Sequence, residues 1–358
     1  QAAAGVHLDF FDARGRKGID LGVKATAAED GLQVSVFPET PVIAYRNFRI
    51  NGDNYVFLGR EHEVRADIDL LADDGTAMSL LGEPTDSIND LTLSMLNVNL
   101  SELSDVLPVM PRLGGMLSGD IHITAGRFEP SLSAAALVQT RALEFEGALL
   151  GDLGVEAFYL PMADSAHYAH AYISAGDREV MQCEGTYSND RFAGEAHIDG
   201  LPLQMANGFL VGTDFLLDGY AKGDLSLRQE DDGMRIDGAL AFDSAHVLSD
   251  VYGINLAMDT TTLVMADSRL LFDRFGLRSN GRGKPLEITG SLDLSQMDNM
   301  RMSLLMKAKN FELVNTRRKM SSLLYGKVYA DVVGQLEGSA DAVTVKGKMD
   351  ILDRTDMT

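Results

Sequence analysis

Strict alternation of apolar and polar residues is the feature that most constrains how this chain can fold. In segment 286–294, Leu286, Ile288, Leu292 and Leu294 occupy every second position, with Gly290 in the same phase. The same period recurs in segments 19–25, 64–70, 117–125, 221–227, 236–242, 302–308 and 343–351. A period of two gives a strand one apolar and one polar face, and such strands are typically antiparallel. Asn-Gly and Asp-Gly turn signals separate several of these segments. We therefore predict an all-β chain that forms an elongated, curved antiparallel sheet.

A glycine lies on the apolar face of many of these predicted strands. The shared pattern is apolar-x-Gly-x-apolar-x-apolar, and its glycines are Gly119, Gly194, Gly223, Gly238, Gly290 and Gly347. The chain has 35 glycines in 358 residues, above the usual share of about 7%. A missing side chain lets a sheet bend sharply or lets another group approach the backbone. For a single glycine a barrel or sandwich corner explains the pattern, but its recurrence favours a repeated architecture.

A longer repeat becomes visible when the glycines are aligned with their flanking residues. Segment 115–120 matches segments 219–224 and 326–331, with offsets of 104 (219 − 115) and 107 (326 − 219). Helical spacing of apolar residues precedes each match and predicts short amphipathic helices at Ser101–Met110, Leu203–Leu210 and Val314–Leu324. Equal spacing of whole units indicates stacked repeats. We expect a β-rich segment at 1–96, repeats at 97–198 and 199–309, and the start of another at 310–358.

The predicted helices need a surface on which to bury their apolar stripes. A short amphipathic helix is only marginally stable in water until that stripe is covered. We therefore expect Leu103, Phe209 and Leu323 to dock against the concave face of the curved sheet and to narrow it.

The charge balance excludes several classes of partner. The chain has 31 Lys and Arg against 53 Asp and Glu, a formal charge of −22, which disfavours nucleic acid and anionic membrane surfaces. Apolar content of 45% is typical of a globular protein, and no apolar run approaches the ~18 residues of a membrane span. Cys183 is the single cysteine, so no intramolecular disulfide forms. The chain opens at Gln1 without an initiator Met, and we expect it to be an internal fragment.

Motifs that would support catalysis are weak. His167 and His170 have half of a metal-site spacing, but no Cys or carboxylate cluster accompanies them. Segment 276–285 resembles a phosphate-binding loop but lacks the Lys-Ser/Thr pair that such a loop needs. A group of nearby aspartates lacks the spacing of a calcium loop; its members are Asp67, Asp69, Asp73 and Asp74. We predict a protein that is not an enzyme and that needs no cofactor and no metal.

The repeated units are similar to those of a known family. An amphipathic helix, then Gly-x-x-x-Gly-Asp, then a second glycine-bearing strand resembles the TamB family, within the broader AsmA-like group. Segment 37–50, Phe-Pro-Glu-Thr-Pro-Val-Ile-Ala-Tyr-Arg-Asn-Phe-Arg-Ile, is similar to a segment of Bacteroidota-type TamB-like proteins. The chain differs from that family in lacking its N-terminal inner-membrane anchor and its C-terminal tail.

The resemblance implies a fold, a location and a function. The fold would be a β-taco, a long sheet bent into a U with an aliphatic lining and a polar exterior. Such proteins are inner-membrane-anchored, extend through the periplasm, carry phospholipid to the outer membrane and assist outer-membrane protein assembly with a barrel partner. Any membrane contact would be made by parts of the full-length chain outside these 358 residues. The family has no catalytic residues.

The expected functional surface is the apolar groove, and alternation supplies its residues. They are Leu117, Ile121, Ile123, Leu225, Leu227, Leu240, Phe242, Ile288, Leu292, Leu294, Met302, Leu304, Met306, Val345, Met349 and Ile351. We expect them to face an interior that can hold phospholipid acyl chains. The alternative is a structural repetitive β protein, such as a surface stalk or an adhesin, whose interior is packed shut. A glycan-binding sandwich would need an exposed aromatic platform, and a sequence with no Trp shows none.

Overall fold

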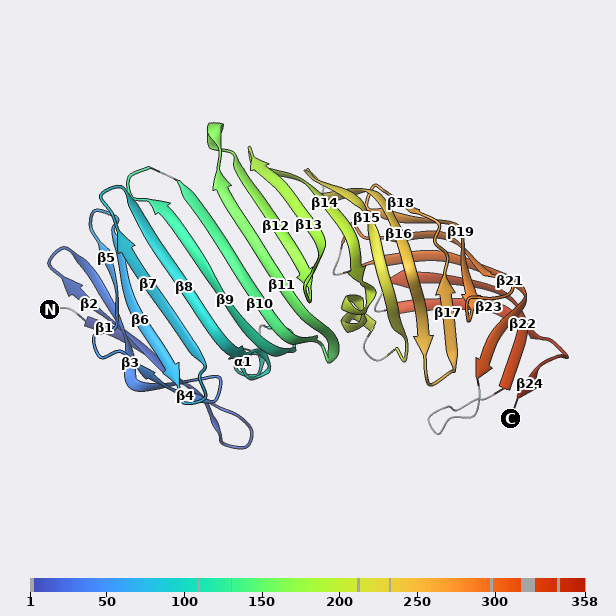
Figure 1. The fold of residues 1–358 in the computed structure, drawn as a ribbon, viewed down its shortest axis with the longest axis horizontal. Coiled ribbons are helices and arrows are strands. Elements are labelled where there is room, and N and C mark those ends of the chain that lie inside the picture. The colour runs from blue at the N-terminus through green and yellow to red at the C-terminus, as the bar shows by residue number, and fades with distance from the viewer. Residues whose placement is uncertain are drawn as a thin grey trace. The chain divides into compact units, whose positions relative to one another are not determined.

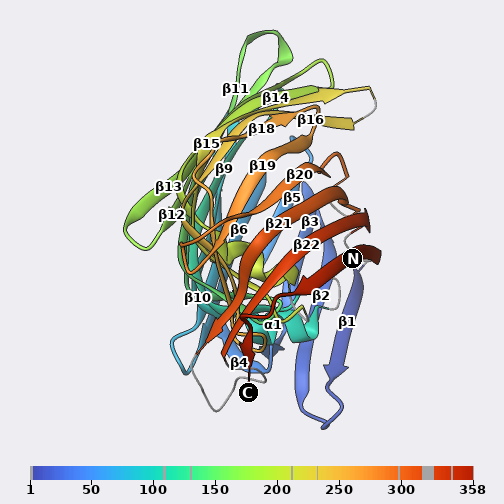
Figure 2. The ribbon, with the colours of Figure 1, turned by 90° about the vertical axis from the view of Figure 1, so that its right-hand side faces the viewer.

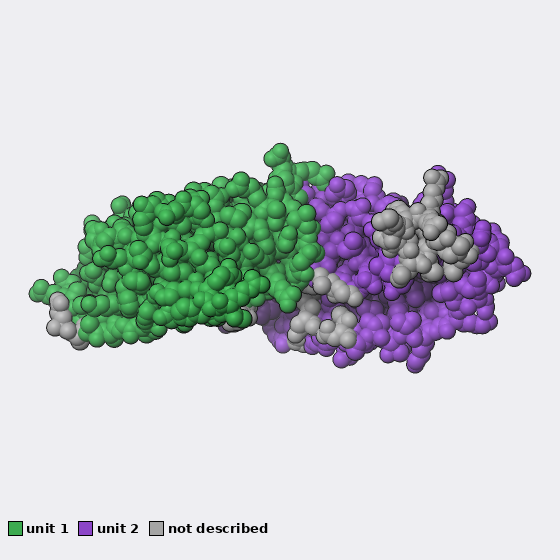
Figure 3. Space-filling view, turned by 90° about the horizontal axis from the view of Figure 1, so that it is seen from below, with its two compact units in different colours: residues 1–178 green, residues 179–358 purple. Residues whose placement is uncertain are grey.

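The computed structural model describes residues 3–107, 110–129, 131–210, 213–231, 233–296, 299–316, 326–339 and 342–357. The chain divides into two compact units, unit 1 from Gln1 to Arg178 and unit 2 from Glu179 to Thr358 (Figure 3). Each unit is an antiparallel sheet with very little helix, which confirms the all-β prediction. No described helix is long and apolar enough to cross a membrane.

Unit 1 is a meander in which most strands that follow one another in the chain are paired in the sheet (Figure 1). Its strands are β1 (Ala3–Phe11), β2 (Lys17–Ala28), β3 (Gly31–Ile43), β4 (Arg46–Ile50), β5 (Tyr55–Gly59), β6 (Val64–Ala72), β7 (Ala77–Pro84), β8 (Ile88–Asn99), β9 (Leu113–Gly126), β10 (Leu132–Phe145), β11 (Ala148–Pro161) and β12 (His167–Ala175). Its helical segments are α1 (Leu100–Val106) and a 3₁₀ turn, η1 (Ala163–Ser165).

Unit 2 continues the same pattern with its own strands. They are β13 (Arg178–Ser188), β14 (Arg191–Pro202), β15 (Leu216–Glu230), β16 (Gly233–Ser249), β17 (Ile254–Met258), β18 (Leu263–Ala266), β19 (Arg269–Ser279), β20 (Leu286–Asp293), β21 (Arg301–Thr316), β22 (Gly326–Ser339), β23 (Ala342–Ile351) and β24 (Asp356–Met357). Residues 203–210 form a 3₁₀ helix, η2 (Leu203–Leu210). The direction of the strands changes along the sheet of this unit, as the side view shows (Figure 2).

Two of the three predicted helices are present, and the third prediction is wrong in part. The first helix covers Leu100–Val106 rather than Ser101–Met110, and the side chain of Asn99 caps its first amide groups. The second, η2, has the predicted bounds. Val314–Thr316 belong instead to β21, where Val314 pairs with Val328 of β22. The rest of that prediction, residues 317–325, lies outside the described residues. The β-branched side chain of Val314 favours the pleated strand.

Long strands bend at bulges that side chains of the next strand stabilise. Ala142 of β10 has a positive φ of 49°, and its N–H donates to Asp152 Oδ1 at 2.7 Å. Asn310 of β21 has φ 56° and donates in the same way to Asp331 Oδ1 at 2.7 Å. A bulge bends its strand and increases the local twist. These sites divide strands of 14 to 16 residues into two arms.

The helical segments tie the sheet at equivalent positions of two predicted repeats. Ser104 Oγ of α1 accepts the N–H of Leu113 at 3.1 Å. Asn207 of η2 accepts the N–H of Leu217 at 2.7 Å and donates to its carbonyl at 3.0 Å. Leu113 and Leu217 each lie two residues before a repeat glycine, so the structure reproduces the offset of 104 (217 − 113). The repeat boundaries at 96/97, 198/199 and 309/310 are not tested and stay predictions.

The backbone conformation at Gly115, the first of these glycines, requires a glycine. Gly115 has φ 99°, a region that side chains other than hydrogen rarely allow. A Cβ atom there would lie 2.6 Å from the carbonyl oxygens of both Arg141 and Ala142. The glycine therefore lets β9 pass close to the bulge of β10.

Candidate functional site

The register of unit 1 places an aliphatic surface on one face of seven adjacent strands, β6 to β12. Directly opposed residues of paired strands share a face, so each row can be followed from strand to strand. The middle row is Ile68, Leu80, Leu93, Ile121, Ala136, Ala157 and Ala171. One flanking row is Leu70, Met78, Met95, Gly119, Val138, Val155 and Ile173, and the other is Ala66, Gly82, Leu91, Ile123, Ala134, Tyr159 and Ala169.

We call this surface the concave face, because α1 lies on it and connects distant strands of the unit. Val106 of α1 is buried against Ile19 of β2 and Ala44, with Leu103 packed beside them. Phe10, Leu21 and Ile43 complete the cluster from β1, β2 and β3. In the sheet, β2 and β8, the strand that precedes α1, are separated by roughly 24 Å, five strand spacings. The sheet must curl around α1 for this contact to form. The predicted docking of Leu103 is therefore confirmed, whereas Leu323 and the side chain of Phe209 lie outside what the structure describes.

Three predicted groove residues belong to this face of unit 1. Leu117, Ile121 and Ile123 lie on β9, and all three are half-buried. Leu117 opposes Val98 of β8 and Thr140 of β10. No second layer of described residues covers the middle of the face. Over six strand spacings it extends roughly 29 Å.

Several residues of this face were missed by the sequence analysis. The alternation Leu91-x-Leu93-x-Met95 in β8 was a usable signal. The alanines of β10 to β12 were harder to find, because Ala134 to Ala136 put the same side chain on both faces and so remove the contrast between them. These short side chains leave the β10–β12 part of the face shallower than the part built from Leu, Ile and Met.

In unit 2 the predicted groove residues share one face, but much of that face is filled. The unit's core consists of Leu256, Leu263, Met265, Leu270, Phe275, Leu277, Leu286, Ala308 and Phe311. Packed against it are seven predicted groove residues: Leu225, Leu240, Phe242, Ile288, Leu292, Leu294 and Met306. Phe311 is completely buried, and the rings of Phe242 and Phe272 lie 6.0 and 5.9 Å from that of Phe275. Around β17 to β21, protein side chains therefore occupy the interior.

Fewer side chains cover the apolar face of unit 2 toward β23. Met302 and Leu304 of β21 pair in register with Leu292 and Gly290 of β20 and are half-buried. On β23, Val345, Met349 and Ile351 are 67%, 50% and 55% exposed. Leu227 of β15 opposes Ile236 of β16 on the same face and is half-buried. An open apolar surface thus also exists in unit 2, beside its packed core.

Cys183 lies on the apolar face of unit 2. It opposes Ala196 of β14, which in turn opposes Leu225 of β15. Burial raises the pKa of the Cys183 thiol, which favours the neutral thiol over the reactive thiolate.

The structure brings together few groups that could hold a metal. His167 and His170 of β12 are three residues apart and lie on opposite faces: His167 stacks on Tyr159, whereas His170 contacts Tyr172. Asp74 is instead paired with Arg46 at 2.7 Å. The predicted absence of a metal site stays a prediction.

One group of possible ligand atoms does occur among the described residues. His7, Asp9 and Asp20 have ligand atoms within 4.8 Å of one another. The ammonium of Lys17 already lies among them, 2.5 Å from Asp20 and 3.3 Å from Asp9. The local negative charge is therefore partly neutralised, and a metal ion would have to displace this lysine.

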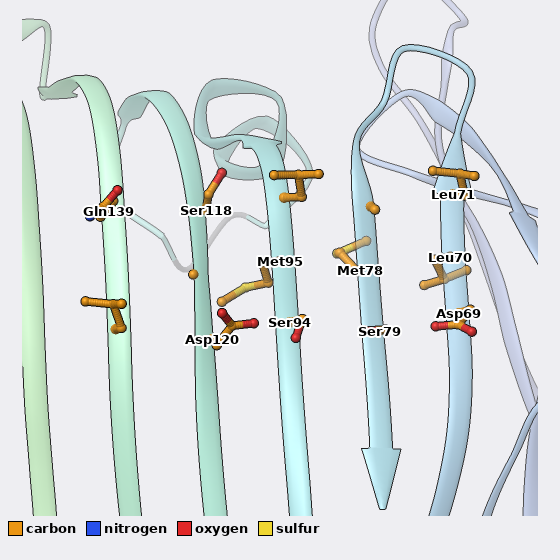
Figure 4. Close-up of a pocket in the computed structure, with 14 residues that line it drawn as sticks. Asp69, Leu70, Leu71, Met78, Ser79, Ser94, Met95, Ser118, Asp120 and Gln139 are labelled. Atoms are coloured by element: carbon orange, nitrogen blue, oxygen red, sulfur yellow. The ribbon is translucent and has the colours of Figure 1, made fainter.

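The opposite, convex face of unit 1 is polar with scattered leucines. A depression of about 650 Å³ extends over β6 to β10 on this side (Figure 4). Its side chains include Asp69, Leu71, Leu96, Asp120 and Leu137.

Comparison with known proteins adds no relative: no family model, no curated protein and no solved structure matches this chain.

Proposed function

We propose that this chain is a non-enzymatic part of a periplasmic bridge that carries phospholipid acyl chains along the concave face toward the outer membrane. The observation that carries the proposal is the aliphatic surface of unit 1, continuous over β6 to β12 and uncovered by a second layer of described residues. A sheet with one apolar face normally buries it against another layer. Here an acyl chain would supply that cover.

The energetics require an unbroken surface. Each buried methylene contributes roughly 0.8 kcal/mol, so a chain of ~16 carbons needs on the order of 10 kcal/mol of apolar lining when it leaves a bilayer. The three rows of unit 1 contain only Gly, Ala, Val, Leu, Ile and Met apart from Tyr159. A charged side chain in such a row would be a barrier, because an acyl chain cannot solvate it.

By the same resemblance to the TamB family, we propose a location and a partner. The full-length protein would be anchored in the inner membrane and extend through the periplasm. It would contact a barrel protein that assembles outer-membrane proteins. The acidic composition suits a conduit that does not adhere to anionic membranes along its length.

A structural role is the second candidate, and the packed core of unit 2 favours it. Phe311, Phe275 and Leu263 fill the interior in that region, as they would in a stalk or an adhesin. The two candidates differ in what they require of unit 1: a structural protein has no use for an uncovered aliphatic face.

The test is a charge placed on each face of the same sheet. Ile121→Asp puts a carboxylate in the middle row of the concave face, and Thr92→Asp puts one on the convex face of β8. Because Ile121 is half-buried and can still reach water, we expect both variants to fold and to melt within a few degrees of the parent. Mass spectrometry of organic extracts should find phospholipid with the parent and Thr92→Asp, and much less with Ile121→Asp. Phospholipid absent from all three proteins would contradict the proposal and leave the structural role.

A further inference from the structure

The depression on the convex face of unit 1 has no place in the proposed lipid path, because it lies on the other side of the sheet. Its residues follow from register: Asp69, Ser79, Ser94 and Asp120 oppose one another across β6, β7, β8 and β9. Figure 4 shows Asp69 and Asp120 on separate strands of the depression, with the two serines on the strands between them. The small serine side chains account for the hollow between the carboxylates.

The apolar part of the depression is accessible to solvent. Leu71 of β6, Leu96 of β8 and Leu137 of β10 are 46%, 50% and 52% exposed. Leu96 is next to Asn97, which has φ 51° in a bulge of β8. The bulge is where β8 departs from regular pairing with β9, and bulges often redirect side chains at functional sites. Exposed apolar groups collected in a hollow with a polar rim mark interaction sites.

The charges decide what kind of partner fits. Neither Asp69 nor Asp120 forms an ion pair with any of the described residues. Two carboxylates in the hollow repel phosphate, and the formal charge of −22 adds to that repulsion. An acyl chain alone would leave both carboxylates without a counter-charge. A partner with aliphatic side chains flanked by Lys or Arg satisfies both features.

We infer that this depression is a docking site for a cationic amphipathic helix of a partner protein. Asp69 and Asp120 are separated by three strand spacings, roughly 14 Å, which a helix covers in about ten residues. Leucines on the same stripe, at the i+4 and i+7 positions between two basic residues, would meet Leu96 between the carboxylates and Leu71 beside Asp69. Leu137 lies beyond Asp120, on β10, where the end of the helix would pass.

The experiment uses the whole chain and a synthetic helical peptide of 18 residues. The peptide has two lysines eleven residues apart, with leucines on the same stripe between them and alanines elsewhere. Its affinity is measured by fluorescence anisotropy at low and at high salt. We expect saturable binding that weakens in high salt, since the charges involved are exposed.

Paired variants locate the binding. Asp69→Asn with Asp120→Asn should weaken binding about fivefold to tenfold at low salt, and Leu71→Ser with Leu96→Ser at least tenfold. Asp53→Asn with Asp86→Asn removes the same charge from exposed turns, and Leu160→Ser removes an exposed leucine of β11 outside the depression. Both controls should bind like the parent. Circular dichroism melting verifies that each variant is folded.

Several results would overturn the inference. Equal loss of binding in the controls would mean that the peptide responds only to net charge. Unchanged binding in the depression variants would place the site elsewhere. Flotation with phosphatidylglycerol vesicles that depends on Leu71 and Leu96 would make the surface a membrane contact instead.

Discussion

At the scale of the residue, burial separates two kinds of apolar side chain on the apolar faces of the two units' sheets. Phe311 has no exposed surface and fixes the core of unit 2, whereas Ile121 of unit 1 is half-buried. Alternation assigns Ile121 to an apolar face, whereas Phe311 follows the bulge at Asn310 and is out of phase with Met302 to Met306. The pattern therefore does not distinguish a packed residue from a lining one. That distinction depends on which strands approach each other across the curl.

Truncation of Phe311 tests the packed interior. Phe311→Ala leaves a large cavity and should lower the free energy of unfolding by about 3–5 kcal/mol. Denaturant unfolding followed by circular dichroism measures the change, since the chain has no Trp. Val345→Ala on the exposed β23 should stay within about 0.5 kcal/mol of the parent. If Phe311→Ala lowered the free energy of unfolding no more than Val345→Ala does, the interior of unit 2 would not be packed.

The His197–Asp224 pair makes a prediction about pH. The hydrogen bond that the His197 imidazole donates to Asp224 at 2.6 Å, and then the charge of this carboxylate, raise the pKa of His197. Because the folded-state pKa exceeds the unfolded value, the pair stabilises the fold fully below pH about 6.5. This stabilisation is lost as the pH rises through the folded-state pKa. NMR titration of the imidazole should give a midpoint above the ordinary histidine value, and Asp224→Asn should lower it. An unchanged midpoint in Asp224→Asn would refute the assigned cause.

At the scale of the element, short helical segments act as clamps rather than as independent helices. α1 has only 7 residues and η2 has 8, too few to be stable alone in water. What holds them is tertiary: the stripe of α1 on the concave face, and the side-chain bonds of Ser104 and Asn207 to the following strand.

Loss of one clamp should be measurable. Asn207→Ala removes both hydrogen bonds to Leu217 and leaves its N–H without this partner, at a cost of about 1–3 kcal/mol. Amide hydrogen exchange at Leu217 should accelerate accordingly. Gln33→Ala, an exposed position of β3, serves as the control and should leave that amide unchanged. Equal protection of Leu217 in Asn207→Ala would mean that the clamp contributes nothing.

Strands were more predictable than helices for a physical reason. A period of two in 286–294 or 343–351 reports directly that one face of a strand is apolar, and β20 and β23 lie there. The helical spacing before Gly326 was ambiguous, because Leu313 and Val314 suit either element. In the structure both belong to β21, where Leu313 packs against the core and Val314 pairs with β22. Tertiary pairing overrode the local pattern.

The curl of unit 2 could not be predicted from alternation. It depends on aromatic side chains from β16, β19 and β21 meeting in one cluster, Phe242, Phe275 and Phe311 among them. These residues are 33 to 69 positions apart in the chain (275 − 242 and 311 − 242). No local period records such a meeting. The bulge that bends β21 likewise depends on Asp331, 21 residues after Asn310.

At the scale of the whole molecule, the two units support different parts of the account. Unit 1 has an uncovered aliphatic face, and unit 2 combines a packed core with an apolar surface that opens toward β23. A purely structural protein would need neither the uncovered aliphatic face of unit 1 nor the open apolar surface of unit 2. The proposed conduit uses both open surfaces.

Photo-crosslinking from neighbouring residues of one strand tests the conduit most directly. Ala136 of β10 lies in the middle row of the concave face, and Ala135, the preceding residue, lies on the convex face. A photoreactive amino acid is placed at either position, and the folded protein is irradiated in the presence of phospholipid. The account predicts a lipid adduct from position 136 and little or none from position 135. No adduct at 136, or equal adducts at the two positions, would contradict lipid transport along the concave face.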